Sequence, residues 1–432
     1  MRNVIILGAG LSGLSCAYHC KDNYKIYEKS DRIGGLCKSE KIKGYTFDYG
    51  PHILYSIDPY ATKLIHKLLK ENLYEKAREA WIYHKINNIY TRFPFQSHLY
   101  GLPKNIVEEC ISGLFEAYTN PDKQEPKNYK EWMYQVFGKG ITDYLMVPYA
   151  YRIWTIGPEK MNYDWIKRRV PTPNIEEIID GAIRDSSKEA GFNIEFWYPV
   201  KGGIQALPES FLNHIKIVNL NSEATKIYLK KKKAEINYEN KESYDYLVST
   251  LPLPELIKLI DEVPPDVKRA ANNLLNNSIY CVNLGINRPD ITDKHWMYFY
   301  EDDFVFHRIS FPMNFSAFTT PEGKSSISTE IAYSKFRPMS KDTVIERAIN
   351  SLKKANLLFN DDKIEVTQVL NLKYAYIIYD LNHRKNVDKI HSFLIANNII
   401  SCGRFGEWEY FNMDHSIMSG KKAADKLNKL LY

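Results

Sequence analysis

The chain has 432 residues, a formal net charge of +6 at pH 7, and 44% hydrophobic and 25% charged residues. This composition is ordinary for a soluble globular protein, and the length is sufficient for two or three domains with sizeable cores. The charge is mild and no stretch concentrates it, which excludes a strongly basic nucleic-acid-binding chain.

The N-terminal stretch carries the strongest local pattern. Four consecutive apolar residues, Val4 to Leu7, predict a buried parallel strand. A Gly-x-Gly-x-x-Gly turn follows, then a helical run over Leu14–Cys20 and a second strand over Tyr24–Tyr27 that ends at Glu28. This order of strand, glycine turn, helix, strand and acid is typical of dinucleotide-binding folds.

Each residue of this pattern has a physical task. Gly8 makes the tight turn, Gly10 lets the backbone approach a pyrophosphate, and Gly13 lets the helix pack closely on the sheet. The helix N-terminus then faces the phosphates, and Glu28 accepts hydrogen bonds from ribose hydroxyls. The alternative is a tight strand–helix turn that binds no nucleotide.

Further turns along the chain indicate which dinucleotide is bound. The pair Gly34-Gly35 follows Glu28 closely, and small residues there permit the backbone to pass near an extended FAD. A strand then runs into Gly50-Pro51-His52, which is consistent with either a histidine on the flavin side or a structural histidine. Gly403–Gly406 provides another turn before the last helix, for which Asp414 is the expected N-cap.

The remaining elements are predicted in chain order as helices, short strands and connecting turns. We expect a helix over 58–73, a strand pair over 81–90, a loop over 92–96, helices within 105–169, a strand and turn over 197–203, strands over 246–250, 280–286, 296–300, 306–310 and 327–333, helices over 342–355 and 387–396, a strand over 399–401 and a helix over 414–431. The run Lys230–Lys233 lies between two alternating segments, so a solvated hairpin tip is favoured over a nucleic-acid patch.

The fold class expected from this order is α/β (α+β overall), with a discontinuous nucleotide-binding domain. Residues 1–75, 197–250 and 398–432 are expected to form a Rossmann-like FAD-binding domain. Residues 98–185 are expected to form an inserted helical substrate-binding domain. Residues 76–97 and 251–397 are expected to form a substrate domain that contains an antiparallel β-sheet.

The six cysteines are scattered and include no Cys-x-x-Cys pair, so neither a metal site nor a disulfide framework is indicated. No uninterrupted apolar run reaches the length needed to span a membrane. We therefore expect a reducing, cytoplasmic setting without membrane insertion.

Several stretches together resemble the UDP-galactopyranose mutase family, and the resemblance covers nearly the whole chain. The stretches, in chain order, are Arg92-Phe93-Pro94-Phe95-Gln96, residues 128–154 with Pro148-Tyr149-Ala150, Lys167-Arg168-Arg169-Val170, Trp296-Met297-Tyr298-Phe299 with Phe306-His307-Arg308, and Gly403-Arg404-Phe405-Gly406 through Tyr410 to Ser416. Several motifs match the eukaryotic branch of that family more closely.

The resemblance implies a flavin reaction without net redox change. In this family, reduced FAD attacks the anomeric carbon of a UDP-hexose through N5, and the sugar recloses so that the pyranose and furanose forms interconvert. NADPH or NADH is a possible reductant of the flavin, and a homo-oligomer is a possible assembly.

The resemblance also implies roles for individual residues. Catalytic roles fall to His52, Arg169, Arg308 and Arg404. The cofactor would be bound by Gly8, Gly10, Leu11, Ser12, Gly13, Glu28, Lys29, Gly34, Gly35, Leu36, Gly50, Pro51, His52, Ala224, Gly403, Arg404, Met413, Asp414 and Ser416. The substrate would be bound by Phe93, Gln96, Trp154, Arg169, Trp296, Tyr298, Arg308, Phe315, Tyr376, Arg404, Tyr410 and Asn412.

The chain departs from the family pattern at four positions. Phe93 and Phe315 lack the hydroxyls of the eukaryotic tyrosines, Pro51 replaces a glycine, and Ala150 replaces an asparagine. These changes leave the sugar, and the nucleotide base, open. The competing interpretations are a mutase for another nucleotide sugar, a net-redox flavoprotein of the amine oxidase or protoporphyrinogen oxidase type, and a catalytically silent nucleotide-sugar binder.

Overall fold

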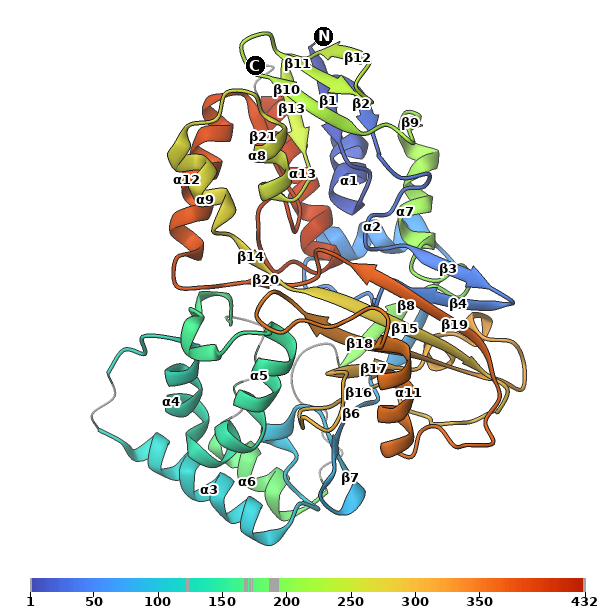
Figure 1. Cartoon of the computed structure of the whole chain (residues 1–432), viewed down its shortest axis with the longest axis vertical. Helices are drawn as coiled ribbons and strands as arrows, with labels where there is room; N and C mark the ends of the chain where they lie inside the picture. The colour runs from blue at the N-terminus through green and yellow to red at the C-terminus, as the bar shows by residue number, and fades with distance from the viewer. Residues whose placement is uncertain are drawn as a thin grey trace.

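A computed structural model of the chain describes residues 2–121, 124–166, 170, 172, 174–185 and 194–429. Its two largest sheets are a five-stranded parallel sheet and a seven-stranded mixed sheet. Figure 1 shows the parallel sheet at one end of the long axis, a group of helices at the other end, and the seven-stranded sheet between them.

The parallel sheet unites strands from distant parts of the chain. Its order is β21-β13-β1-β2-β9, with β1 (Asn3–Leu7), β2 (Asn23–Tyr27), β9 (Val218–Asn219), β13 (Tyr246–Ser249) and β21 (Ile399–Ser401). Val4 and Ile6 pack on one face of the sheet, and Ile5 and Leu7 pack on the other. Because both faces are buried, β1 is apolar at every inward position.

Helices cover both faces of this sheet. One face shares its core with α1 (Leu11–His19), α2 (Pro59–Leu69), α7 (Ala206–Ser210) and α13 (Met413–Lys429). The other shares its core with α8 (Leu253–Leu259), α9 (Pro265–Asn272) and α12 (His383–Ala396). The predicted domain division assigned these last three helices to the substrate domain, whereas their apolar side chains pack against the nucleotide-binding sheet.

A small sheet extends this end of the molecule. It contains β10 (Ala224–Tyr228), β11 (Lys233–Ile236) and β12 (Asn240–Ser243) in antiparallel order. Tyr228 pairs with Lys233, so the lysine run forms the tip of a hairpin, as predicted.

The seven-stranded sheet has the order β19-β15-β18-β17-β16-β6-β7 and is antiparallel except for the β16–β6 pair. Its strands are β6 (Ala80–His84), β7 (Ile89–Arg92), β15 (Ser278–Ile286), β16 (Trp296–Tyr298), β17 (Arg308–Ser310), β18 (Ser325–Tyr333) and β19 (Ile364–Leu372). Helix α11 (Val344–Lys354) packs on one face.

Short elements join the two sheets. They are the hairpin β3 (Ser39–Ile42) and β4 (Tyr45–Asp48), the pair β5 (Tyr74–Ala77) and β8 (Glu195–Tyr198), the pair β14 (Leu275–Asn276) and β20 (Ile377–Ile378), and α10 (Pro312–Phe315). Strand β19 and helices α8 and α9 were not among the predicted elements.

The helical region is built from α3 (Lys104–Thr119), α4 (Tyr129–Ile141), α5 (Val147–Trp154) and α6 (Ile175–Ile183). The Asn128 side chain accepts a hydrogen bond from the Glu131 amide at 3.0 Å and so caps α4. Helices α3 and α4 approach closely because Gly113 faces the backbone of Lys139 and Gly140. This region packs against the seven-stranded sheet in one shared core.

The last helix begins one residue earlier than predicted. Because α13 starts at Met413, Asp414 lies in the first turn and does not cap the helix, which corrects the predicted N-cap. Its carboxylate accepts a hydrogen bond from His415 Nδ1 at 2.8 Å. An acid in the first turn still interacts favourably with the helix dipole.

The described residues contain neither a membrane-spanning helix nor a cluster of metal-binding side chains. Among these residues, no helix combines the length and apolar character that a membrane crossing requires. No group of three or more histidine, cysteine, aspartate or glutamate side chains in the described parts of the chain is arranged to hold a metal ion.

Asp48 links β4 to β3, to β8 and to the turn before α7 through hydrogen bonds. Its carboxylate accepts hydrogen bonds from Ser39 Oγ at 2.6 Å, Tyr198 OH at 2.7 Å and the Ile204 amide at 3.1 Å. Burial raises the pKa of this carboxyl to about 6, although the three hydrogen bonds oppose the shift. The folded protein therefore keeps a proton on Asp48 over a pH range in which the unfolded chain releases it.

We predict that this shift makes stability fall as pH rises from about 4 to about 6. The folded-state pKa exceeds the unfolded value, so the contribution is complete below pH 4 and is lost as pH passes through 6, amounting to about 3 kcal/mol. Urea unfolding of the wild type and of Asp48→Asn, compared from pH 4 to 7, measures it. A difference in unfolding free energy that stays constant over this range would contradict the prediction.

Candidate active site

A large cavity lies between the two main sheets. Its volume is about 1260 Å³, and it is lined by the carboxyl ends of β1, β2 and β13, by the turn after β21, and by residues of β15 to β19. A pocket for a single small molecule is commonly about 300–1,000 Å³. The cavity is therefore large enough for two ligands, and it lies where parallel sheets bind nucleotides.

The dinucleotide end has the geometry that the glycine pattern predicts. Gly8 has φ +96°, and a β-carbon at this position would clash with Thr250 Oγ1. Gly10 and Gly35 face each other so closely that a β-carbon on Gly35 would lie 3.3 Å from the Gly10 Cα. Gly13 does not line the cavity; it lies beneath the loop, where a β-carbon would meet the Gly8 carbonyl oxygen at 2.0 Å.

Glu28 lies at the end of β2 and is held in place by backbone amides. Its Oε2 accepts from the Ala9 amide at 2.8 Å, and its Oε1 accepts from the Ser30 amide at 2.9 Å. Each carboxylate oxygen retains a second lone pair, and the side chain lines the cavity. This fixed carboxylate is suited to accept hydrogen bonds from a pair of ribose hydroxyls.

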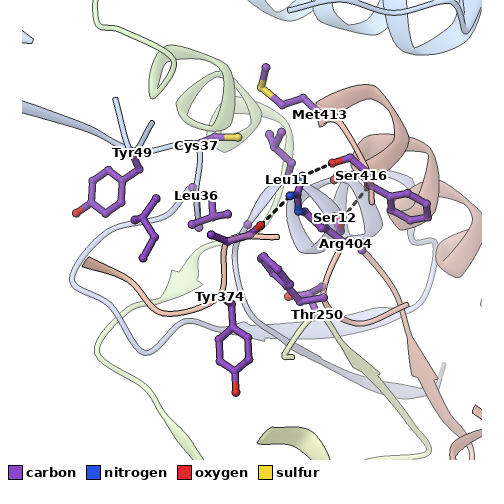
Figure 2. Close-up of a pocket in the computed structure, with 18 of the residues that line it drawn as sticks. Leu11, Ser12, Leu36, Cys37, Tyr49, Thr250, Tyr374, Arg404, Met413 and Ser416 are labelled. Carbon is purple, nitrogen blue, oxygen red and sulfur yellow. Dashed lines mark hydrogen bonds between the residues drawn. The ribbon is translucent and has the colours of Figure 1, made fainter. Parts of the chain in front are cut away.

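Two helix N-termini meet at the centre of the cavity. Figure 2 shows Leu11 and Ser12 of α1 together with Met413 and Ser416 of α13 around the same space. Ser12 Oγ donates to the Ser416 carbonyl at 2.9 Å, so the two helix starts are joined directly. Unsatisfied amides at helix N-termini attract anions, and two together are suited to a pyrophosphate.

The His52 turn forms another wall. His52 Nδ1 lies 2.9 Å from the Gly50 carbonyl oxygen. Burial, together with the nearby positive charges of Arg404 and Arg308, lowers the pKa of His52 to about 4. The imidazole is therefore neutral at pH 7, with its Nδ1 proton donated to Gly50.

A buried ion pair occupies the end of the cavity on the seven-stranded sheet. Arg308 on β17 and Glu330 on β18 are directly opposed, and Arg308 Nε donates to Glu330 Oε2. Arg308 Nη2 also donates to Tyr376 OH at 3.2 Å. Burial lowers the pKa of Arg308, but the Glu330 carboxylate outweighs this effect and holds the pKa well above its usual value. Arg308 is therefore a permanent cation facing the cavity.

Arg404 supplies a second guanidinium near the first. Its terminal nitrogens donate to the carbonyls of Phe411 at 2.8 Å and Ala375 at 2.7 Å. The guanidinium lies 4.9 Å from the ring centre of Tyr410 and 5.3 Å from that of Tyr376. Asn412 follows on the same stretch and also lines the cavity.

An aromatic wall completes this end. Phe93 and Tyr298 have ring centres 4.8 Å apart, and both line the cavity with Trp296. Trp296 is 4% exposed, and no hydrogen-bond partner for its Nε1 is found among the described residues. A buried indole N–H without a partner is unusual and costly.

The structure brings most of the predicted site residues into one cavity. The predicted cofactor residues that line it are Gly8, Gly10, Leu11, Ser12, Glu28, Lys29, Gly34, Gly35, Leu36, Gly50, Pro51, His52, Ala224, Gly403, Arg404, Met413, Asp414 and Ser416. The predicted substrate residues that line it are Phe93, Trp296, Tyr298, Arg308, Tyr376, Arg404, Tyr410 and Asn412.

The other predicted substrate residues lie elsewhere. Gln96, Trp154 and Phe315 are buried and do not line the cavity. Trp154 packs against two residues that line the cavity, with its ring centre 5.8 Å from that of Tyr376 and 6.1 Å from that of Tyr410. The ring centre of Phe315 lies 6.4 Å from that of Trp296. Arg169 lies outside the described residues.

Glu330 lines the cavity and pairs with Arg308, and the sequence patterns did not predict it. It is the one acidic residue of β18, which is otherwise built from small, hydroxyl-bearing and apolar residues, and it is 3% exposed. A single acid inside a buried strand is a recognisable signal, since burial of a charge requires a partner. Thr250, Ile279 and Leu372 also line the cavity without having been predicted.

The comparison with solved structures gives matches along the whole chain. A crystal structure of reduced UDP-galactopyranose mutase superposes with a TM-score of 0.95 and 26% sequence identity, covering 100% of this chain and 94% of that one. Putrescine oxidase bound to putrescine matches with a TM-score of 0.66 at 16% identity over 99% of each chain, which shows a shared fold alone. The predicted fold class and the predicted resemblance are confirmed.

Several of the curated relatives are oxidases. Protoporphyrinogen oxidase 2 of Arabidopsis thaliana is 26% identical over 263 residues, which is 51% of this chain and 49% of that protein. The chain thus spans about half the length of this relative. The family described as flavin-containing amine oxidoreductases matches residues 11–428. The chain therefore belongs to the family of flavin-containing amine oxidoreductases.

Proposed function

We propose that this protein is an FAD-dependent nucleotide-sugar mutase that interconverts the pyranose and furanose forms of a UDP-hexose, of the UDP-galactopyranose and UDP-galactofuranose type. The observation that carries the proposal is the pair of cavity-lining guanidiniums, Arg308 and Arg404, in a fold that matches UDP-galactopyranose mutase along its whole length. NADPH or NADH is proposed as the source of reducing equivalents, and a cytoplasmic location stays a prediction.

The residues present fit a flavin dinucleotide. The Gly10–Gly35 approach leaves room for backbone contact with a pyrophosphate, and the α1 and α13 N-termini supply amide donors to it. Glu28 supplies fixed acceptors for a ribose. When bound and reduced, the flavin supplies a nucleophilic nitrogen for the anomeric carbon of the sugar.

The protein's own part of the chemistry is to hold a leaving group of high negative charge. A nucleoside diphosphate departing from the sugar gains charge, and guanidiniums stabilise it through charge-assisted hydrogen bonds. Arg308 is suited to this because Glu330 fixes its Nε side and leaves other N–H groups toward the cavity.

The same geometry disfavours the net-redox alternative. A protonated amine entering this cavity would meet Arg308 and Arg404, and like charges in a buried site repel strongly. The oxidase activities of the curated relatives still define the second candidate function, and they are tested in the same assay.

The test is conversion of nucleotide sugars by the dithionite-reduced protein under anaerobic conditions. We expect UDP-galactofuranose or a related UDP-furanose to be converted to its pyranose, and no conversion by the oxidised protein. A panel of UDP-, GDP- and dTDP-sugars identifies the sugar and the base. Absence of conversion for every sugar, together with continuous oxygen consumption in the presence of an amine or a porphyrinogen, would replace the mutase by an oxidase.

A second prediction concerns Arg308. Replacing Arg308 alone would leave the Glu330 carboxylate buried without its partner, so we combine Arg308→Gln with Glu330→Gln. We expect UDP to bind about 100-fold more weakly, equivalent to about 2.7 kcal/mol, because a charge-assisted contact is lost. Isothermal titration calorimetry measures the Kd, and flavin absorbance measures retained FAD.

The matched control is Arg92→Gln. Arg92 pairs with Glu79 at 3.4 Å and lies over the Trp81 ring, and it does not line the cavity. We expect its UDP affinity to change less than about twofold, as for a surface residue. Unchanged affinity in the Arg308→Gln, Glu330→Gln protein would show that the diphosphate is not bound there.

A further inference from the structure

Asn277 is a buried residue that joins the site to the helical region. It lies between β14 and β15 and is 1% exposed. Its amide donates to the Tyr376 carbonyl at 2.9 Å, and its carbonyl accepts from the Ala375 amide at 3.1 Å. Its side-chain Oδ1 accepts from the Tyr376 amide at 2.9 Å, and its Nδ2 donates to the Ile153 carbonyl.

These hydrogen bonds fix the relative positions of two aromatic residues, Tyr376 and Trp154. Tyr376 receives the hydrogen bond of Arg308 through its hydroxyl at 3.2 Å and lines the cavity. Ile153 precedes Trp154, whose ring packs edge-on against Tyr376 with centres 5.8 Å apart. One amide side chain therefore fixes the backbone of both members of this ring contact, although Asn277 itself does not line the cavity.

An amide is well suited to this position. The site demands one acceptor toward the Tyr376 amide and one donor toward the Ile153 carbonyl, and asparagine carries both groups in one plane. At 1% exposure, bulk water is not available to replace either bond. A carboxylate would lack the donor, and an alanine would leave both backbone groups without their partner.

We propose that Asn277 is a positioning residue for nucleoside diphosphate binding, acting through the hydroxyl of Tyr376. This inference rests on the proposed function. By locking the Tyr376 backbone against α5, Asn277 places the Tyr376 hydroxyl beside Arg308, so that both groups face the diphosphate in one arrangement. A merely structural tie would affect the stability of the fold and leave the UDP affinity of the folded protein unchanged.

The experiment is a double-mutant cycle on the FAD-loaded full chain, with UDP as the probe. We expect Asn277→Ala to weaken UDP binding about tenfold and Tyr376→Phe to weaken it by a similar factor. In the Tyr376→Phe background, Asn277→Ala is expected to cost less than about threefold, because the hydroxyl that it positions is gone. Asn277→Ser, which keeps a small polar group, is measured in parallel in case the alanine variant does not fold.

The matched control is Asn276→Ala. The Asn276 side chain donates to the carbonyls of Lys373 and Asn277, each at 2.9 Å, but among the described residues it makes no hydrogen bond to Tyr376 or to α5. We expect less than a twofold change in UDP affinity for this control. Equal costs of the Asn277 substitution in both backgrounds, or equal effects of Asn276→Ala and Asn277→Ala, would overturn the inference. If the wild type binds no nucleoside diphosphate, the proposed function fails and this inference fails with it.

Discussion

Neutralisation of charge inside a buried cavity is the constraint on which the candidate site depends. Arg308 lies in the cavity wall and forms an ion pair with Glu330. Removing either partner would leave the other charge poorly solvated and unpaired, which is costly. The pair is built from directly opposed residues of β17 and β18, so the seven-stranded sheet itself sets its geometry. The remaining donors of Arg308 and the Arg404 guanidinium then line the cavity as a source of positive charge. Such a site is suited to an anionic ligand.

The parallel sheet provides positive charge at the other end of the cavity by different means. There, backbone amides at two helix starts supply the partial positive charge. The serine bond from α1 to α13 holds these starts together, although they lie about four hundred residues apart in the chain. The two sheets therefore present two anion-binding devices to one continuous cavity, which suits a dinucleotide cofactor and a nucleotide substrate held at the same time.

The sequence predicted best those features that depend on local spacing. Gly8, Gly10, Gly13 and Glu28 act within one strand–helix–strand unit, and the structure places them as the spacing indicates. Glu330 was missed because its partner is 22 residues away and their pairing depends on strand register. Register is set by tertiary packing and cannot be read from one strand.

Side-chain direction explains the other differences. Gln96 and Trp154 belong to motifs of the resembling family, yet both are buried outside the cavity lining, because motif membership does not specify which way a side chain points. Helices α8 and α9 were missed because each spans only about two turns, and their apolar residues gain stability from packing on the parallel sheet. Their place in the nucleotide-binding core could be found only from the fold.

We propose that a flavin bound in this cavity serves a reaction without net redox change, although the chain belongs to a family of oxidoreductases. The most direct measurement is the number of sugar molecules converted per reducing equivalent supplied under anaerobic conditions. The protein is reduced once with a stoichiometric amount of dithionite, and UDP-hexofuranose is then added in large excess. We predict that each reduced flavin converts many sugar molecules and that the flavin still shows the spectrum of its reduced form at the end. A limit of one conversion per reducing equivalent would contradict it.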